Sequence, residues 1–128
     1  MVDDAPVGRV VLARILATVH DVVEADNGAS ALALAQGTRF DVVLTDVNMP
    51  VMDGFELARM LRGMPSYAHT PIFATTTEAR RAEIARGNAV GITAWIVKPV
   101  DGRVLLRAIS EVLGRAGAST SRDRDPVV

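Results

Sequence analysis

The sequence predicts an α/β fold in which a parallel sheet carries helices on both faces. Short β-branched runs alternate along the chain with windows of helical periodicity, and the runs are too short to be helices. Alternation of this kind builds βαβ units with right-handed crossovers. Strands covered on both faces read as continuous apolar runs, as VVL at 42–44 and WIV at 95–97 do.

Val and Ile are concentrated in the four clearest strands, at 21–25, 40–45, 71–76 and 94–97. Met1-Val2 suggests a further strand, but Asp3 and Asp4 follow after only two residues, whereas a strand usually has about five or six. We therefore expect the first strand to be truncated.

Helical periodicity marks the windows between the strands, at 7–19, 30–36, 55–61, 78–88 and 104–113. The window at 78–88 is mostly Ala and Arg, with Ile84 as its only large apolar residue, so we expect it to be weakly held. We expect one domain over residues 1–114. Residues 115–128 are small, polar and charged, which predicts a disordered tail.

Composition excludes several classes of function. The chain has 128 residues, 49% of them hydrophobic, and a formal net charge of −1, which does not favour non-specific binding to nucleic acid or anionic lipid. It has no cysteine, so disulfides and thiolate chemistry are excluded. No apolar run would span a membrane, and the amino-terminal residues lack the apolar stretch of a signal peptide. We expect a cytoplasmic protein with no direct nucleic-acid or membrane partner.

Polar residues follow several of the predicted strands, where ligands bind in open parallel sheets. They are Asp3 and Asp4 after the first strand, Asp46 after the third, Thr75, Thr76 and Thr77 after the fourth, and Lys98 after the fifth. Lys98 is also the only lysine of the chain. Each has an ordinary alternative role, since Asp caps helices, Thr forms turns, and Lys is usually solvated.

Taken together, these residues suggest phosphoryl chemistry. Three clustered carboxylates repel one another unless a cation joins them, and Mg²⁺ prefers oxygen ligands. Asp46 ends the most apolar strand and is the natural nucleophile towards a phosphoryl group. Lys98 and a Thr hydroxyl would then hold the phosphoryl oxygens.

The motifs resemble the receiver domain of two-component response regulators, and most closely the single-domain chemotaxis regulators. The matching stretches are VDD at 2–4, VVLTDVNMPVMDG at 42–54, PIFATTTEA at 71–79 and WIVKP at 95–99. The resemblance implies a doubly wound, flavodoxin-like sheet of five strands in the order 2-1-3-4-5. It also implies a monomer or weak dimer whose output is binding to a downstream protein.

The resemblance implies that a sensor histidine kinase phosphorylates Asp46 with Mg²⁺ as cofactor. The metal ligands would be Asp3 (through water), Asp4, Asp46 and the carbonyl of Asn48. Thr76 and Lys98 would contact the phosphoryl group, Asn48 and Thr77 would tune its lifetime, and Trp95 would move inward with Thr76. The Lys98–Pro99 bond would be cis. Catalysis beyond self-phosphorylation and self-dephosphorylation is not expected.

The sequence departs from the family in three places. The first strand is short, which predicts a marginally stable domain that apolar residues added before Met1 would stabilise. Val100 stands where the family usually has Phe. Trp95 is bulkier than the usual Tyr or Phe, which predicts a restricted inward rotamer.

Four alternative functions remain open. The chain could be an interaction module that does not depend on phosphorylation, or a receiver excised from a larger regulator or hybrid kinase. A haloacid-dehalogenase-type phosphatase is disfavoured because Asn48 stands where its second Asp is needed. An FMN carrier is disfavoured because two carboxylates follow the first strand, where such a carrier binds phosphate.

The remaining polar and aromatic residues have structural interpretations. His20 and His69 stand alone in predicted loops and are expected at the surface. Phe40, Phe55 and Phe73 are expected in the core. Asp53 is expected to cap the helix that follows it.

Overall fold

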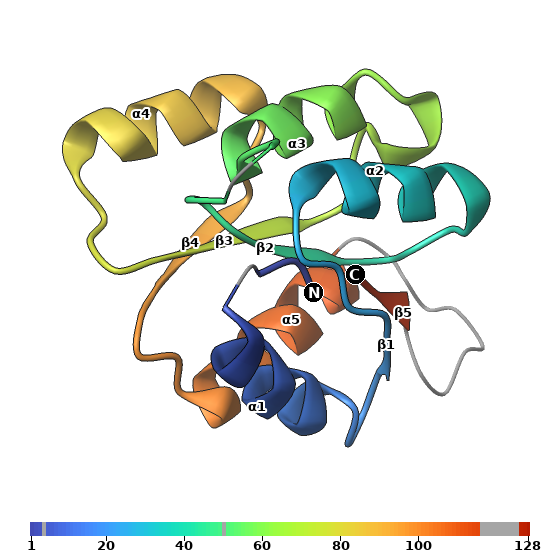
Figure 1. Cartoon of the computed structure of the whole chain (residues 1–128), viewed down its shortest axis with the longest axis vertical. Helices are drawn as coiled ribbons and strands as arrows, with labels where there is room; N and C mark the ends of the chain where they lie inside the picture. Colours follow the sequence, from blue (N-terminus) through green and yellow to red (C-terminus); the bar gives the residue numbers. More distant parts are fainter. Residues whose placement is uncertain (4, 50, 116–125) are drawn as a thin grey trace.

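The computed structural model describes residues 1–3, 5–49, 51–115 and 126–128. Its sheet lies between two layers of helices, with α2, α3 and α4 on one face and α1 and α5 on the other (Figure 1). The helices are α1 (Pro6–Leu16), α2 (Gly28–Gly37), α3 (Gly54–Arg62), the 3-10 turn η1 (Pro65–Tyr67), α4 (Arg81–Val90) and α5 (Gly102–Arg115). The strands are β1 (Asp21–Val22), β2 (Val43–Asp46), β3 (Ile72–Thr76), β4 (Ala94–Val97) and β5 (Pro126–Val127).

All strand pairs of the sheet are parallel. β2 pairs with β3, and β3 pairs with β4. β1 pairs with β5, and isolated bridges join this pair to the rest: Val2 bridges Ala25 and Thr45, and Val127 bridges Val42. The spatial order is therefore β1, then Val2 together with β5, then β2, β3 and β4. This arrangement confirms the predicted α/β class and the order 2-1-3-4-5.

The prediction of a disordered tail over 115–128 is wrong for the last residues. Pro126–Val127 form β5, and Val127 and Val128 are almost fully buried. The physical reason is that Met1–Asp3 pair with only part of the neighbouring segments, and these apolar residues fill the remaining room between β1 and β2. The added residues that we expect to stabilise the first strand would have to enter this same space. Arg115 ends α5, and residues 116–125 lie outside the described part of the chain.

Two apolar cores lie on the two faces of the sheet. Phe40, Phe55, Leu57 and Ile72 belong to the core beneath α2, α3 and α4. The other core, towards α1 and α5, includes Phe73. All three Phe side chains are at most 4% exposed, as predicted.

Local capping explains where two of the helices begin. Asn27 accepts a hydrogen bond from the Ser30 amide at 2.9 Å, and the predicted cap Asp53 accepts one from the Glu56 amide at 2.9 Å. The helix predicted at 78–88 begins later, at Arg81, without a side-chain cap. It ends at Gly91, whose φ of 90° suits glycine.

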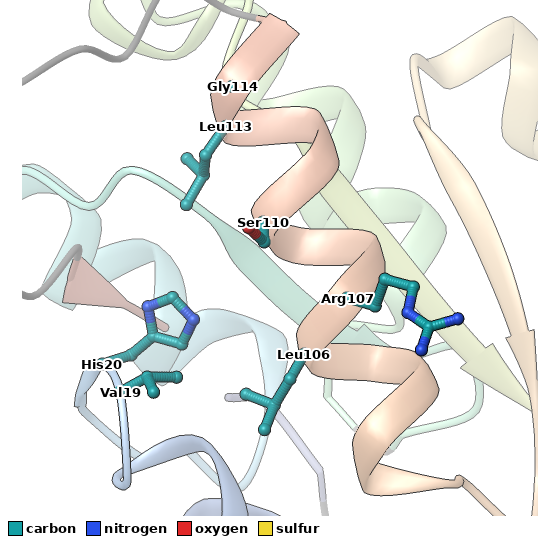
Figure 2. A pocket seen from close by; sticks show the side chains of 7 residues that line it. All are labelled: Val19, His20, Leu106, Arg107, Ser110, Leu113 and Gly114. Atoms are coloured by element: carbon teal, nitrogen blue, oxygen red, sulfur yellow. The ribbon is translucent and has the colours of Figure 1, made fainter.

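His20 is buried, contrary to the prediction that it lies at the surface. It is 6% exposed because the turn after α1 folds back, with the His20 amide donating to the Leu16 carbonyl at 2.9 Å. Figure 2 shows Val19 and His20 facing Leu106, Ser110 and Leu113 of α5 across a pocket. His69 is exposed, as predicted.

Arg62, the last residue of α3, forms hydrogen bonds with two other segments of the chain. Its guanidinium donates to the carbonyls of Tyr67 at 2.7 Å, Thr70 at 2.6 Å and Gly91 at 2.7 Å. Burial lowers the pKa of Arg62, although guanidinium groups remain charged. These contacts hold η1 and the turn before β4 against α3.

We expect Arg62→Met to lower the free energy of unfolding by about 2 kcal/mol, because three partly buried carbonyls lose a charged donor. Urea denaturation would measure the change. Arg59→Met, at an exposed position of the same helix, is the matched control and should change stability little. Equal effects of the two substitutions would contradict the role assigned to Arg62.

Candidate functional site

The carboxyl ends of neighbouring strands bring the predicted acidic and basic residues together. Asp46 ends β2, Thr76 ends β3, and Lys98 directly follows β4. Asp3 follows Val2, which lies between β1 and β2. Because all these strands run parallel, their carboxyl ends meet at one edge of the sheet.

A lysine joins two buried carboxylates at this edge. The Lys98 ammonium nitrogen lies 3.0 Å from Asp46 Oδ2 and 3.7 Å from Asp3 Oδ2. Asp3 is 3% exposed and Asp46 is 7% exposed, whereas the Lys98 side chain is 27% exposed. The cluster therefore holds two negative charges and one positive charge in a largely desolvated place.

This imbalance shifts two pKa values. Burial raises the pKa of Asp46, and the Asp3 charge adds to the rise, although the hydrogen bond and charge of Lys98 oppose it. Burial disfavours the charged form of Lys98, but Asp46 and Asp3 together raise its pKa above the ordinary value. An additional cation beside the carboxylates would relieve the remaining repulsion, and oxygen donors suit Mg²⁺.

Gly54 allows α3 to begin directly against Asp46. A Cβ at Gly54 would lie 2.4 Å from the Asp46 carbonyl oxygen, closer than real Cβ atoms approach. The Gly54 amide donates to the Val47 carbonyl at 2.9 Å and closes the loop between β2 and α3. Val51 in this loop has a φ of 70°, an unfavourable value for a β-branched residue.

The Thr76 hydroxyl bonds to the turn that precedes α4. Its Oγ1 donates to the Glu78 carbonyl at 3.1 Å and accepts from the Glu78 amide at 3.3 Å. The Lys98 amide donates to the Thr76 carbonyl at 2.7 Å, so the backbones of both residues are fixed together. Thr76 is 2% exposed, whereas Thr77 is exposed.

Trp95 lies half-buried beneath α4. Its ring packs 5.9 Å from Phe55, centroid to centroid, and Arg86 of α4 stacks over the same Phe55 ring at 4.2 Å. A Cβ at Gly87 would lie 2.3 Å from Trp95 Cζ2, so the glycine leaves the room that the indole fills. Its indole Nε1 is buried without a hydrogen-bond partner in the described part of the chain.

The structure brings three of the predicted site residues into one cluster: Asp3, Asp46 and Lys98. Asn48 is exposed in the loop after β2, Asp4 lies outside the described residues, and the Lys98–Pro99 bond is cis, as predicted. Within the described ranges, no group of three or more acidic or histidine side chains is placed to hold a metal ion. Sequence reasoning missed Gly87, which stands out as the only glycine within the Ala- and Arg-rich window at 78–88.

Comparison with known proteins identifies the family. The sequence profile of the response regulator receiver domain matches residues 1–110. The chain belongs to the response regulator receiver family. Receiver domains are signalling switches of two-component systems rather than classical enzymes.

This receiver domain is similar to proteins of two lengths. It is 32% identical over 117 residues to the chemotaxis protein CheY of Pseudomonas aeruginosa, covering 90% of this chain and 94% of that protein. It is 38% identical over 114 residues to the gliding motility regulatory protein of Myxococcus xanthus, covering 88% of this chain. The chain spans only 15% of the length of the Myxococcus protein.

Two solved structures share its fold. Chemotaxis protein CheY4 of Vibrio cholerae has a TM-score of 0.84 and 42% identity, with 88% of this chain and 94% of that chain covered. The receiver domain of a sensor histidine kinase of Pseudomonas aeruginosa has a TM-score of 0.82 and 27% identity, with 88% and 93% covered. That second structure has a magnesium ion coordinated in its active-site cleft.

Among the described residues, no helix combines the length and the apolar character needed to cross a bilayer.

We expect Asp46→Asn to raise the free energy of unfolding at pH 7 by about 1 kcal/mol. The folded-state pKa of Asp46 is raised, so folding disfavours its charge above that pKa, and this cost vanishes below the ordinary value of 3.8. The two proteins should therefore converge in stability as the pH falls below about 4. Chemical denaturation at both pH values measures this, with the exposed Asp26→Asn as control. A variant less stable than the parent at pH 7 would contradict the assigned charge balance.

We expect Gly87→Ala to shift the fluorescence of Trp95, the only tryptophan, to longer wavelength. The added methyl group would overlap the rigid indole, which must then rotate towards solvent. Gly37→Ala, where a Cβ meets open space in α2, is the matched control and should leave the emission unchanged. An unchanged spectrum for Gly87→Ala would show that the indole does not depend on this space.

Proposed function

We propose that Asp46 is the phosphoryl acceptor of this receiver and that a sensor histidine kinase is the donor. The observation that carries the proposal is the cluster of Asp46 and Asp3 around the Lys98 ammonium at the carboxyl edge of the sheet. In the transfer, a carboxylate oxygen of Asp46 bonds to phosphorus while the phosphorus–nitrogen bond of the phosphohistidine breaks. Imidazole leaves, and an acyl phosphate forms.

Lys98 has two roles in this scheme. Before transfer, its ammonium group holds Asp46 Oδ2 at 3.0 Å and so orients the carboxylate. After transfer, the same ammonium group neutralises charge on the phosphoryl oxygens. Because the Lys98 side chain is 27% exposed, it retains room to shift towards an arriving group.

The residues proposed to hold Mg²⁺ are Asp3, Asp4, Asp46 and the carbonyl of Asn48. Their chemistry fits the ion, because Asp3 and Asp46 are buried carboxylates that Lys98 neutralises only in part. When bound, the cation would stabilise negative charge on the transferring phosphoryl group. The magnesium ion in the related receiver of a sensor histidine kinase supports this assignment.

The proposed switch runs from Thr76 to the surface formed by α4, β4 and α5. A phosphoryl group on Asp46 offers strong acceptors to the Thr76 hydroxyl, which would then leave the Glu78 backbone. The turn before α4 loses that hydrogen bond, and α4 buries only Gly87 among its residues. A weakly held helix shifts readily between two positions, and Trp95 beneath it would follow.

Output by protein–protein binding in the cytoplasm completes the proposal. The exposed residues on this surface include Thr77, Val97 and Val104. Asn48 and Thr77 are exposed beside the acceptor edge, which suits the proposed role of tuning the phosphoryl lifetime. The same chemistry would serve a receiver within a longer regulator, such as the Myxococcus relative.

We expect incubation with Mg²⁺ and acetyl phosphate to add one phosphoryl group to the protein, as seen by intact mass. Asp46→Asn should abolish the gain, Lys98→Ala should reduce it, and chelation of Mg²⁺ should suppress it. Asp26→Asn, an exposed control, should be phosphorylated like the parent.

Two outcomes would count against the proposal. A mass gain that survives Asp46→Asn would place the phosphoryl group elsewhere. No gain in the folded parent, with either acetyl phosphate or a phosphorylated histidine kinase as donor, would favour an interaction module that does not depend on phosphorylation.

A further inference from the structure

The strand between β1 and β2 is built from both ends of the chain. Opposite β2, the Val128 amide donates to Val42 at 3.0 Å and the Leu44 amide donates to Val128 at 2.7 Å. The ladder then continues with the Val2 amide donating to Leu44 at 2.7 Å and the Asp46 amide donating to Val2 at 2.8 Å. In a parallel ladder, alternate residues bond to the same neighbour, so Val128 and Val2 stand two places apart.

The hydrogen bonds to residues 23 and 25, on the side of this strand opposite to β2, give the same register. The Val23 amide donates to the Val127 carbonyl at 3.0 Å, and the Met1 amino group donates to Val23 at 2.7 Å. The Ala25 amide then donates to Met1 at 3.0 Å, and the Asp3 amide donates to Ala25 at 3.0 Å. The two ladders together place residues 126, 127, 128, 1, 2 and 3 in successive positions of one strand.

Side-chain alternation continues across the break between the two ends. Val127 and Met1 belong to the core towards α1 and α5, whereas Val128 and Val2 belong to the core on the opposite face. All four residues are at most 1% exposed. A shift by one residue would turn these side chains to the wrong faces, so the packing specifies this register.

We propose that the sheet contains a strand-binding slot between β1 and β2, and that the slot takes the carboxyl-terminal segment Pro126–Val128 of the same chain. The ligand class is a short apolar segment, parallel to its neighbours, whose last residue takes the ladder position before Met1. The segment supplies the hydrogen-bonding half-strand that Met1–Asp3 lacks. The slot adjoins the acceptor edge, since the Asp46 amide donates to Val2 in the same ladder, but the test of the slot does not use phosphorylation.

The first test measures how much the carboxyl-terminal segment in the slot contributes to the thermal stability of the protein. A chain ending at residue 125 should melt at least about 5 °C below the full chain. A synthetic peptide of residues 124–128 should restore part of the loss, whereas the same peptide with Asp in place of Val127 should not. Within the full chain, Val127→Asp should lower the melting temperature, and Val104→Asp, at a position 58% exposed, should change it little.

The second test examines the register and does not depend on whether the shortened chain folds. A circular permutant opened between Ser119 and Thr120 would join Val128 to Met1 by a direct peptide bond. It should melt at or above the temperature of the parent. Met1 and Val128 are each 1% exposed, and the direct bond removes the buried amino and carboxylate groups of these two residues. One Gly inserted at the junction should lower the melting temperature, because it breaks the alternation.

Three outcomes would overturn the proposal. The two permutants could melt alike, or the shortened chain could melt like the full chain. A melting temperature of the full chain that rises with protein concentration, together with a dimer in sedimentation, would show that a second copy fills the slot.

Discussion

The structure depends on two buried carboxylates that share one ammonium group. Asp46 and Asp3 sit at the carboxyl edge of the sheet, where burial and the nearby Asp3 charge both disfavour the charge of Asp46, and Lys98 supplies only one compensating charge. Buried carboxylates with raised pKa values and too few compensating charges are typical of functional sites. The surrounding features serve to hold this arrangement: Gly54 lets α3 close over Asp46, and the Lys98 backbone is tied to Thr76.

Charge balance at this edge is coupled to the layer of helices above it. The Thr76 hydroxyl is satisfied by the Glu78 backbone, so any new acceptor near Asp46 competes for that hydrogen bond. The helix that follows, α4, contributes only Gly87 as a fully buried residue, which lies against the Trp95 indole, and its Val90 side chain is only partly buried. When the hydrogen bond of Thr76 at the end of β3 changes, the sparse packing of α4 therefore allows the helix to shift at little cost in free energy.

Much of the fold and of the site was predictable because both rest on local patterns. Apolar runs such as 42–44 mark strands buried on both faces, and the parallel topology then brings Asp3, Asp46 and Lys98 to one edge. The position of β5 was not predictable in this way. Pro126–Val128 follow a polar, charged stretch and are too few to show a period, and only the gap beside Met1–Val2 gives them a partner. His20 was misjudged because its burial depends on how the turn after α1 folds back towards Leu16, which no periodic pattern in the sequence marks.

The burial of both chain ends has a practical consequence for anyone who handles this protein. Met1 and Val128 are each 1% exposed, so an affinity tag or fluorescent fusion at either end would be attached inside the sheet. Such a fusion would compete with the folding of the sheet itself, and loss of function in a tagged protein would then reflect the tag.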